Sequence, residues 1–199
     1  MFHMKSSSRT ASTSGSYEVS AVSDTNALRD IYQAIRDVPD FPKPGIVFKD
    51  ITPLLLEPAP FRRVVELMAA PFRASHVTRV VSIESRGFLL GAPIALALDA
   101  GLVPIRKPGK LPAATGRVEY ALEYGTDALE MHQDAVSGKD RVLIVDDVLA
   151  TGGTAEAAAK LVRKHGATVV GFTFLIELDF LKGRERLRTE RIEALLHYA

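Results

Sequence analysis

The chain has 199 residues, of which 47% are hydrophobic and 25% are charged, so it is long enough to bury the core of one ordinary domain. Lys and Arg total 25 against 24 Asp and Glu, and the net charge of +1 excludes an overall field that would attract nucleic acid or an anionic membrane. The lack of cysteine excludes disulfides and a cysteine nucleophile, and the longest apolar run, residues 88–98, is shorter than the roughly 20 residues that span a bilayer.

The first segment, residues 1–24, is rich in Ser and Thr and contains almost nothing to bury, so the sequence predicts a disordered tail there. A Ser-rich start is also typical of transit peptides, but this one lacks their arginines and their amphipathic pattern. It contains no apolar segment of the secretory kind either. We therefore expect a cytoplasmic protein with a single domain at residues 25–199.

Two helices are predicted at the start of this domain. Apolar residues recur at helical spacing from Ala27 to Val38, so the first helix should begin near Thr25. Two prolines and a glycine at residues 41–46 then predict a loop. A second amphipathic helix is predicted around residues 61–68, directly after two further prolines.

Strands and helices alternate between residues 77 and 178. Apolar runs predict strands at 77–83, 102–106, 141–147 and 168–178, and helical periodicity predicts helices at 88–101 and 154–166. The alternation predicts parallel βαβ units, hence an α/β sheet covered on both faces that binds ligands outside the carboxyl ends of its strands. Residues 118–124 and 128–132 instead flank a Gly-Thr-Asp turn and predict an antiparallel hairpin.

The strongest local signal lies where the third of these strands ends. Asp146 and Asp147 follow four buried apolar residues, and residues 150–154, the glycine loop, then lead into a helix through Thr-Gly-Gly-Thr. Glycines permit positive φ, and N–H groups at a helix N-terminus can seat a phosphate. The loop lacks the lysine of a P-loop and the spacing of a dinucleotide fingerprint. Two carboxylates would repel a polyphosphate but could bind sugar hydroxyls, which suits a ribose 5-phosphate. By itself the pattern also fits a solvated strand end followed by a threonine cap.

This stretch resembles the phosphoribosyl pyrophosphate-binding motif of the type I phosphoribosyltransferases. Four further segments, at residues 40–54, 84–88, 105–112 and 122–126, are similar to the adenine phosphoribosyltransferase family and stand in the family's order. The resemblance runs from about Asp30 to the C-terminus. It implies a type I phosphoribosyltransferase fold, in which a mainly parallel sheet is flanked by helices, with a small hood at about 25–55 and a flexible hairpin lid at about 107–132.

The resemblance also implies an activity. Members of the family transfer a 5-phosphoribosyl group from phosphoribosyl pyrophosphate to adenine, which yields AMP and pyrophosphate in purine salvage. They depend on Mg²⁺, which we expect the donor and water to hold, with no direct protein ligand. They are homodimers, so a homodimer is expected here too.

Roles follow residue by residue from the same resemblance. The 5′-phosphate and ribose are expected to bind Asp146, Asp147, Ala150, Thr151, Gly152, Gly153 and Thr154. The pyrophosphate is expected to bind Glu84, Ser85, Arg86, Arg106, Lys107 and Lys110. Adenine is expected to bind the base loop, which is Val47, Phe48 and Lys49, together with Val148. Glu123 is expected to handle a proton at the base. Lys49 is a mild departure, because the family usually has arginine there.

Simpler interpretations remain for single residues. Arg86 could form a surface ion pair, the cations at 106–110 could be solvated, Phe48 could be a core aromatic, and a hairpin residue such as Glu123 is usually inert. The Ser85-x-Gly87 pattern is only half of a nucleophile elbow, which disfavours a serine hydrolase. Two alternative functions are an enzyme for 6-oxo purines and a regulator that binds the donor without turnover, although the segment before the domain is too short for a winged helix.

Overall fold

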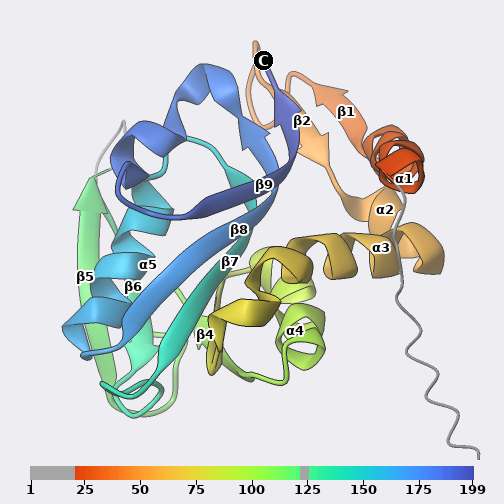
Figure 1. Ribbon diagram of the computed structural model, residues 1–199. Helices are drawn as coiled ribbons and strands as arrows, with labels where there is room; N and C mark the ends of the chain where they lie inside the picture. The colour runs from red at the N-terminus through yellow and green to blue at the C-terminus, as the bar shows by residue number, and fades with distance from the viewer. Residues whose placement is uncertain (1–20, 122–125) are drawn as a thin grey trace, which may run out of the picture.

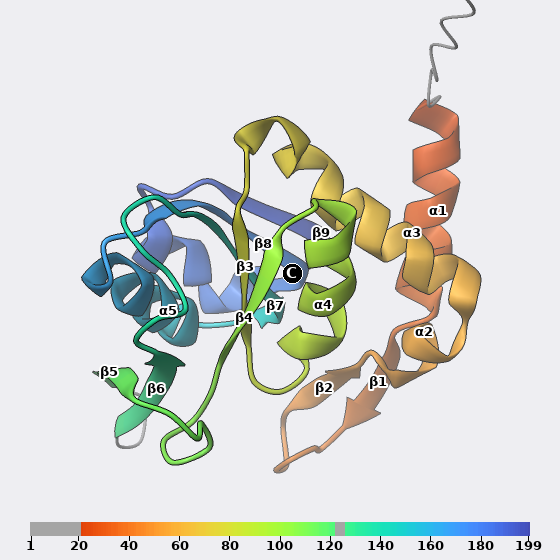
Figure 2. The same cartoon turned by 90° about the horizontal axis from the view of Figure 1, so that it is seen from below.

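The central sheet has five parallel strands. The computed structural model describes residues 21–121 and 126–199, and Figures 1 and 2 show it in two views. In spatial order the strands are β4 (Gly101–Ile105), β3 (Arg79–Ile83), β7 (Arg141–Leu149), β8 (Thr168–Leu178) and β9 (Ile192–Tyr198). Each neighbouring pair is parallel. The predicted α/β class and the four predicted strands are therefore confirmed.

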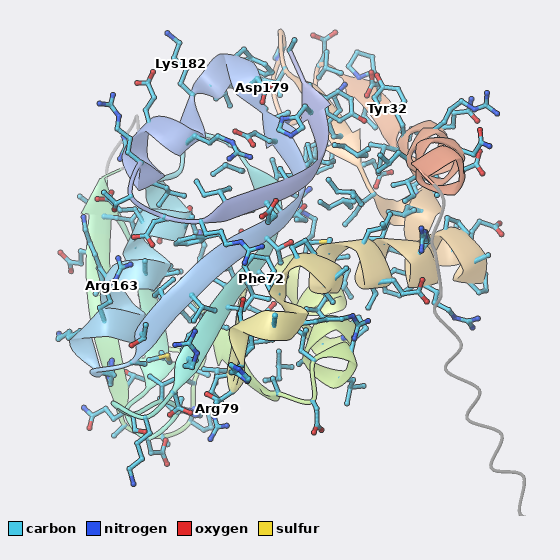
Figure 3. The ribbon with its side chains drawn as sticks, in the orientation of Figure 1. Tyr32, Phe72, Arg79, Arg163, Asp179 and Lys182 are labelled. Atoms are coloured by element: carbon cyan, nitrogen blue, oxygen red, sulfur yellow. The ribbon has the colours of Figure 1, made fainter. Side chains whose placement is uncertain are left out.

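Helices cover both faces of this sheet, as Figure 1 shows. On one face lie α3 (Pro58–Ala69), the 3₁₀ turn η1 (Ala70–Ser75) and α4 (Gly87–Ala97), and on the other lies α5 (Gly153–Lys164). The buried residues of β7 alternate accordingly. Val142 and Ile144 pack in the cluster with α5, whereas Leu143 and Val145 pack in the cluster with α3 and α4. Phe72 of η1, labelled in Figure 3, is fully buried in the second cluster. Because the inner strands β3, β7 and β8 are covered on both faces, their near-continuous apolar runs predicted them correctly.

In the hood, at about residues 25–55, the structure does not have the helix to Val38 that periodicity predicts. The first helix, α1 (Ala21–Gln33), begins four residues before the expected start near Thr25 and ends well before Val38. The following residues form β1 (Arg36–Pro39), which pairs antiparallel with β2 (Val47–Asp50), and a short helix α2 (Thr52–Leu56) follows. Pairing with β2 and the proline at position 39 override the helical pattern of residues 34–38.

The predicted antiparallel hairpin is present. Its strands are β5 (Thr115–Ala121) and β6 (Thr126–His132), and its tip, residues 122–125, lies outside the described residues. The described part packs against α5, because Leu129 and Met131 are buried in the core and Gly116 leaves room for the ring of His165. Closure of the lid at residues 107–132 stays a prediction.

The C-terminal segment was not assigned from the sequence. After β8 come two 3₁₀ turns, η2 (Asp179–Leu181) and η3 (Gly183–Leu187), and then β9, which forms an edge of the sheet. The backbone of η3 packs under the glycine loop, because the carbonyl oxygen of Gly183 lies only 2.5 Å from where a Cβ on Gly152 would be. Among the helices of residues 21–121 and 126–199, none is long and apolar enough to cross a membrane.

Candidate active site

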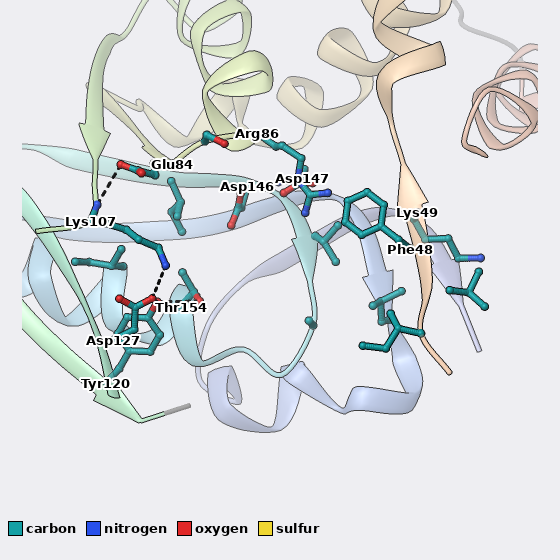
Figure 4. Close-up of a pocket in the computed structure, with 18 residues that line it drawn as sticks. Phe48, Lys49, Glu84, Arg86, Lys107, Tyr120, Asp127, Asp146, Asp147 and Thr154 are labelled. Atoms are coloured by element: carbon teal, nitrogen blue, oxygen red, sulfur yellow. Dashed lines mark hydrogen bonds and ion pairs between the residues drawn. The ribbon is translucent and has the colours of Figure 1, made fainter. Parts of the chain in front are cut away.

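A pocket of about 510 Å³ opens at the carboxyl ends of the central strands (Figure 4). Its lining is formed by Ile46, Val47, Phe48, Lys49, Ile83, Glu84, Ser85, Arg86, Lys107, Tyr120, Asp127, Leu129, Asp146, Asp147, Val148, Ala150, Thr154 and Leu178. Of the predicted site residues within 21–121 and 126–199, five lie outside this lining, namely Arg106, Lys110, Thr151, Gly152 and Gly153. The last three line a small cavity that adjoins the pocket at the glycine loop.

The glycine loop connects β7 to α5 as predicted. Gly152 has φ +79° and precedes the helix, and no side chain there caps the first N–H groups of α5. These N–H groups therefore have no side-chain capping competitor among the described residues, and Thr154, which lines the cavity, adds a hydroxyl beside them. This is the arrangement that binds phosphate at helix N-termini. The sequence did not distinguish the two glycines, and only Gly152 has a positive φ, whereas Gly153 is the first residue of the helix.

The acidic pair lies between the glycine loop and the β3 end. Burial raises the pKa of Asp146 well above its ordinary value, and the charge of Asp147 raises it further. Burial also raises the pKa of Asp147, although Arg86 opposes this effect. Gly87 permits the close approach, because a Cβ there would lie 2.8 Å from Oδ1 of Asp146. The site thus holds two carboxyl groups that gain from hydroxyl donors, and the sugar of a ribose 5-phosphate would provide such donors.

Arg86 forms an ion pair, but it does so in the lining of the pocket and with the buried carboxylate of Asp147. Its Nε is 2.8 Å from Oδ2 of Asp147, and its guanidinium carbon is 4.8 Å from the ring centroid of Phe48. The Nη1 atom of Arg86 is buried and has no hydrogen-bond partner among the described residues. Arg86 therefore retains donor capacity for an anion in the pocket, while its guanidinium rests over the aromatic ring.

The cations at 106–110 are not merely solvated. Arg106 donates from Nε to Oε2 of Glu84 at 3.0 Å, the backbone N–H of Lys107 donates to the same oxygen at 3.1 Å, and Lys110 pairs with Oε1. Burial by itself raises the pKa of Glu84, but these three hydrogen bonds outweigh it and the pKa is lowered. Glu84 therefore holds together the two predicted pyrophosphate segments, which follow β3 and β4.

Two polar residues of the pocket lining, Tyr120 and Asp127, were missed by the sequence analysis. Asp127 accepts a hydrogen bond from Lys107 Nζ at 2.7 Å (Figure 4), and the hydroxyl of Tyr120 lies 3.3 Å from Asp127 and 3.5 Å from the hydroxyl of Thr154. Hydrogen bonding to Asp127 raises the pKa of Lys107, and Lys107 in turn lowers that of Asp127. Asp127 was interpreted as a turn residue, but it lies within β6, opposite Tyr120 in β5. The alternation of side chains along the hairpin was the signal that could have found this pair.

The base loop lines the opposite wall. Val47, Phe48 and Lys49 form most of β2, and Val148 lines the pocket from β7. Phe48 is only partly buried and packs edge-on against Phe41 at 5.2 Å between ring centroids, so the interpretation as a core aromatic is wrong. Glu123, the predicted proton-handling residue, lies outside the described residues.

Comparison with known proteins agrees with this geometry. Residues 54–193 match the family model of the phosphoribosyl transferase domain. An adenine phosphoribosyltransferase of Myxococcus xanthus (strain DK1622) is 61% identical over 180 residues, which cover 90% of this chain and 98% of the relative. The chain belongs to the adenine phosphoribosyltransferase family. Its family relatives are pentosyltransferases, so the resemblance seen in the sequence is confirmed.

Solved structures of adenine phosphoribosyltransferases share the fold. The Rhodothermus marinus protein is 55% identical with a TM-score of 0.84, and the match covers 87% of this chain and 99% of that one. The Saccharomyces cerevisiae protein, solved with D-2,5-dideoxy-2,5-imino-altritol 1,6-bisphosphate and adenine, is 37% identical with a TM-score of 0.82 and coverage of 86% and 99%. The type I phosphoribosyltransferase fold is therefore shown for the described residues.

Proposed function

We propose that the protein transfers a 5-phosphoribosyl group from phosphoribosyl pyrophosphate to adenine, giving AMP and pyrophosphate in purine salvage. The observation that carries the proposal is one pocket in which a glycine loop, an acidic pair and an aromatic base loop meet. The yeast relative was solved in complex with a bisphosphate and adenine, which supports the same pairing of chemistries here. The cytoplasmic location expected from the sequence stays a prediction.

The donor would bind across the carboxyl ends of β3 and β7. Its 5′-phosphate fits the N-terminus of α5, where N–H groups and the hydroxyl of Thr154 can donate to it. Its ribose hydroxyls then fall near Asp146 and Asp147, which can accept hydrogen bonds from them. Its pyrophosphate would lie toward Arg86, whose Nη1 has no partner among the described residues.

Transfer would break the bond between the anomeric carbon and the pyrophosphate oxygen, and would form a bond from that carbon to N9 of adenine. The transition state of such a glycosyl transfer resembles an oxocarbenium ion. Arg86 and Lys107 would stabilise the negative charge that develops on the pyrophosphate. Phe48 and Val148 would hold the purine between them, and Glu123 would take the proton that leaves the base.

Mg²⁺ is proposed as the cofactor. The carboxylates of the pocket suit an ion that is bound by the sugar donor and water and not directly by the protein. Glu84, Asp127 and Asp147 each already have a cationic partner. Among the described residues, the three that approach the geometry of a metal cage are Glu177, Asp179 and His197, and none of them lines the pocket. Mg²⁺ would be held by pyrophosphate and ribose oxygens and by water, where it would neutralise charge on the leaving group.

A homodimer is proposed from an apolar face. Leu89 and Leu96 of α4 are 48% and 83% exposed, and Leu102 of the edge strand β4 is 43% exposed. A helix that is apolar on all sides is normally buried, so this face is suited to a second copy of the chain. The test is sedimentation velocity. Leu96→Lys should convert a parental dimer to monomer, and a parental monomer would contradict the proposal.

The function is tested by measuring base consumption and pyrophosphate release with adenine, hypoxanthine, guanine and xanthine, each with the donor and Mg²⁺. Adenine should be the preferred substrate. Its 6-amino group donates a hydrogen bond where a 6-oxo purine accepts one, so a base loop that suits one leaves the other with unpaired polar groups. Preference for a 6-oxo base would favour the first alternative function, and donor binding without release of pyrophosphate from any base would favour the regulator.

A further inference from the structure

The side chain of Lys49 is unusually buried for a lysine. Only 14% of it is exposed, although Lys is among the residue types least often buried without a partner. Its Nζ donates to Oδ1 of Asp37 at 2.7 Å, across the β1–β2 pair in which the two residues are directly opposite. The other contact is aromatic, because Nζ lies 4.1 Å from the ring centroid of Tyr198. Lys49 is therefore held from two sides.

Tyr198 is the penultimate residue of the chain and the last of β9. Its ring stacks on the ring of Tyr32 from α1, with centroids 5.2 Å apart and planes 18° from parallel, and Tyr32 is labelled in Figure 3. Burial raises the pKa of Tyr198 to about 12, so its ring stays neutral over the ordinary pH range. The C-terminal strand thus contacts the hood through one aromatic residue, and this residue touches Lys49 of the base loop.

The contact matters because the hood strands β1 and β2 are not part of the central sheet. A two-stranded antiparallel pair is marginally stable by itself. The β1–β2 pair forms its own sheet and is not hydrogen-bonded to the central sheet. Lys49 lines the pocket beside Phe48, so the position of its backbone sets which groups face a bound base.

We propose that Tyr198 is a positioning residue for base recognition, which acts by holding Lys49 and thereby fixing the backbone of the base loop. The proposal rests on the proposed function. It assigns to the C-terminal strand a role in the affinity for adenine and none in the affinity for the sugar donor, because the glycine loop and the acidic pair lie on β7 and α5 and do not contact Tyr198 in any interaction described above.

The experiment compares Tyr198→Leu with Tyr198→Phe in steady-state kinetics and in calorimetric titration of AMP. Leucine removes the ring face from Lys49, and phenylalanine keeps it. For Tyr198→Leu the KM for adenine should rise about tenfold, or about 1.4 kcal/mol, while the KM for the donor stays within about twofold. Tyr198→Phe should restore the parental KM for adenine. AMP should bind more weakly to the leucine variant only.

A double-mutant cycle tests whether Tyr198 acts through Lys49. If it does, Tyr198→Leu should change the KM for adenine far less in a Lys49→Met background than in the parent. Should Tyr198→Leu fail to fold, Asp37→Asn provides the second variant, because Asp37 is 59% exposed and its loss should raise the same KM. Phe180→Leu is the matched control, since it removes an aromatic ring that is 61% exposed and does not touch Lys49 in any described contact.

Three results would overturn the proposal. A parental KM for adenine in Tyr198→Leu would show that Lys49 needs no aromatic support. An equal rise in both KM values together with a lower Tm would show a general structural role. Additive effects in the cycle would show that Tyr198 does not act through Lys49. A parent that consumes no adenine but binds the donor would instead refute the proposed function, and the positioning role would fall with it.

Discussion

Replacing Gly152 of the glycine loop with alanine should weaken donor binding. Gly152 has φ +79°, a conformation that costs a non-glycine residue roughly 1–2 kcal/mol. The new Cβ would also lie 2.5 Å from the carbonyl oxygen of Gly183 and 3.3 Å from its carbon. Those atoms are backbone, so they cannot rotate away as a flexible side chain would. Either the loop or η3 must therefore move by several tenths of an ångström.

The consequence for binding follows from geometry. The N–H groups at the start of α5 must meet phosphate oxygens at hydrogen-bonding distance, and displacement by about 1 Å can cost on the order of 100-fold. We expect the affinity for ribose 5-phosphate to fall at least tenfold, by calorimetric titration. The strain and the overlap together should lower stability by about 2–4 kcal/mol, measured by denaturant unfolding.

Gly166→Ala is the matched control at the other end of α5. Gly166 has φ +85°, but the nearest atom to its Cβ would be 3.6 Å away, which is an ordinary contact. The control should therefore lose the conformational part of the stability and none of the affinity. Parental binding of ribose 5-phosphate by Gly152→Ala would refute the assignment of the phosphate to this loop, whereas equal losses of affinity in both variants would refute the geometric argument.

Two further predictions concern Glu123 and Asp50. Glu123→Gln should lower kcat with adenine by roughly 10²–10⁴-fold if the carboxylate handles a proton, with donor binding retained in a parallel titration; a kcat within a few-fold of the parent would reduce Glu123 to a hairpin residue. Asp50 has its pKa lowered from 3.8 to about 2 by hydrogen bonds from Thr52 and from Arg36. The contribution of Asp50 to the free energy of unfolding is therefore fully present above pH 3.8, and it is lost as the pH falls through about 2. Since Arg36 is 62% exposed, the contribution should be discounted to about 1 kcal/mol. Acid titration of the unfolding free energy in Asp50→Asn should show a flatter profile over that interval, and an unchanged profile would contradict it.

The fold could be predicted where local pattern and tertiary environment agree. Strands β3, β7 and β8 are buried on both faces, so their apolar runs were clear, and the glycine that follows α5 marked its end. The hood could not be predicted in the same way. Residues 34–38 carry a helical pattern, but β1 forms because β2 offers it backbone partners, and this pairing depends on a chain reversal at 40–46. The edge strand β9 was missed because it follows two short turns and is only partly buried.

The candidate site also has a part that could be predicted from the sequence and a part that could not. The glycine loop and the acidic pair are adjacent in sequence, so their chemistry was visible before the structure. The contacts of Arg86 and Lys107 were not, because each partner comes from a distant strand: Asp147 lies 61 positions after Arg86, and Asp127 lies 20 after Lys107. Two still more distant pairs, Lys49 with Tyr198 and Tyr32 with Tyr198, join the hood to the C-terminal strand. Local periodicity carries no information about such contacts, because they can be inferred only when the order of the strands in the sheet is known.

Because these cations already have carboxylate partners, they contribute less to the free energy of donor binding than unpaired cations would. The chain has a net charge of +1, so its attraction for a polyanion must be local, yet Arg86 pairs with Asp147 and Lys107 pairs with Asp127. Because an unpaired charge is costly to desolvate, binding the pyrophosphate would exchange carboxylate partners for phosphate ones. Each cation then contributes to binding only the difference between its interaction free energy with phosphate and that with its carboxylate partner. Further affinity should come from groups that have no competing partner among the described residues. These are Nη1 of Arg86 and the N–H groups at the start of α5, where Gly152 sets the path of the chain.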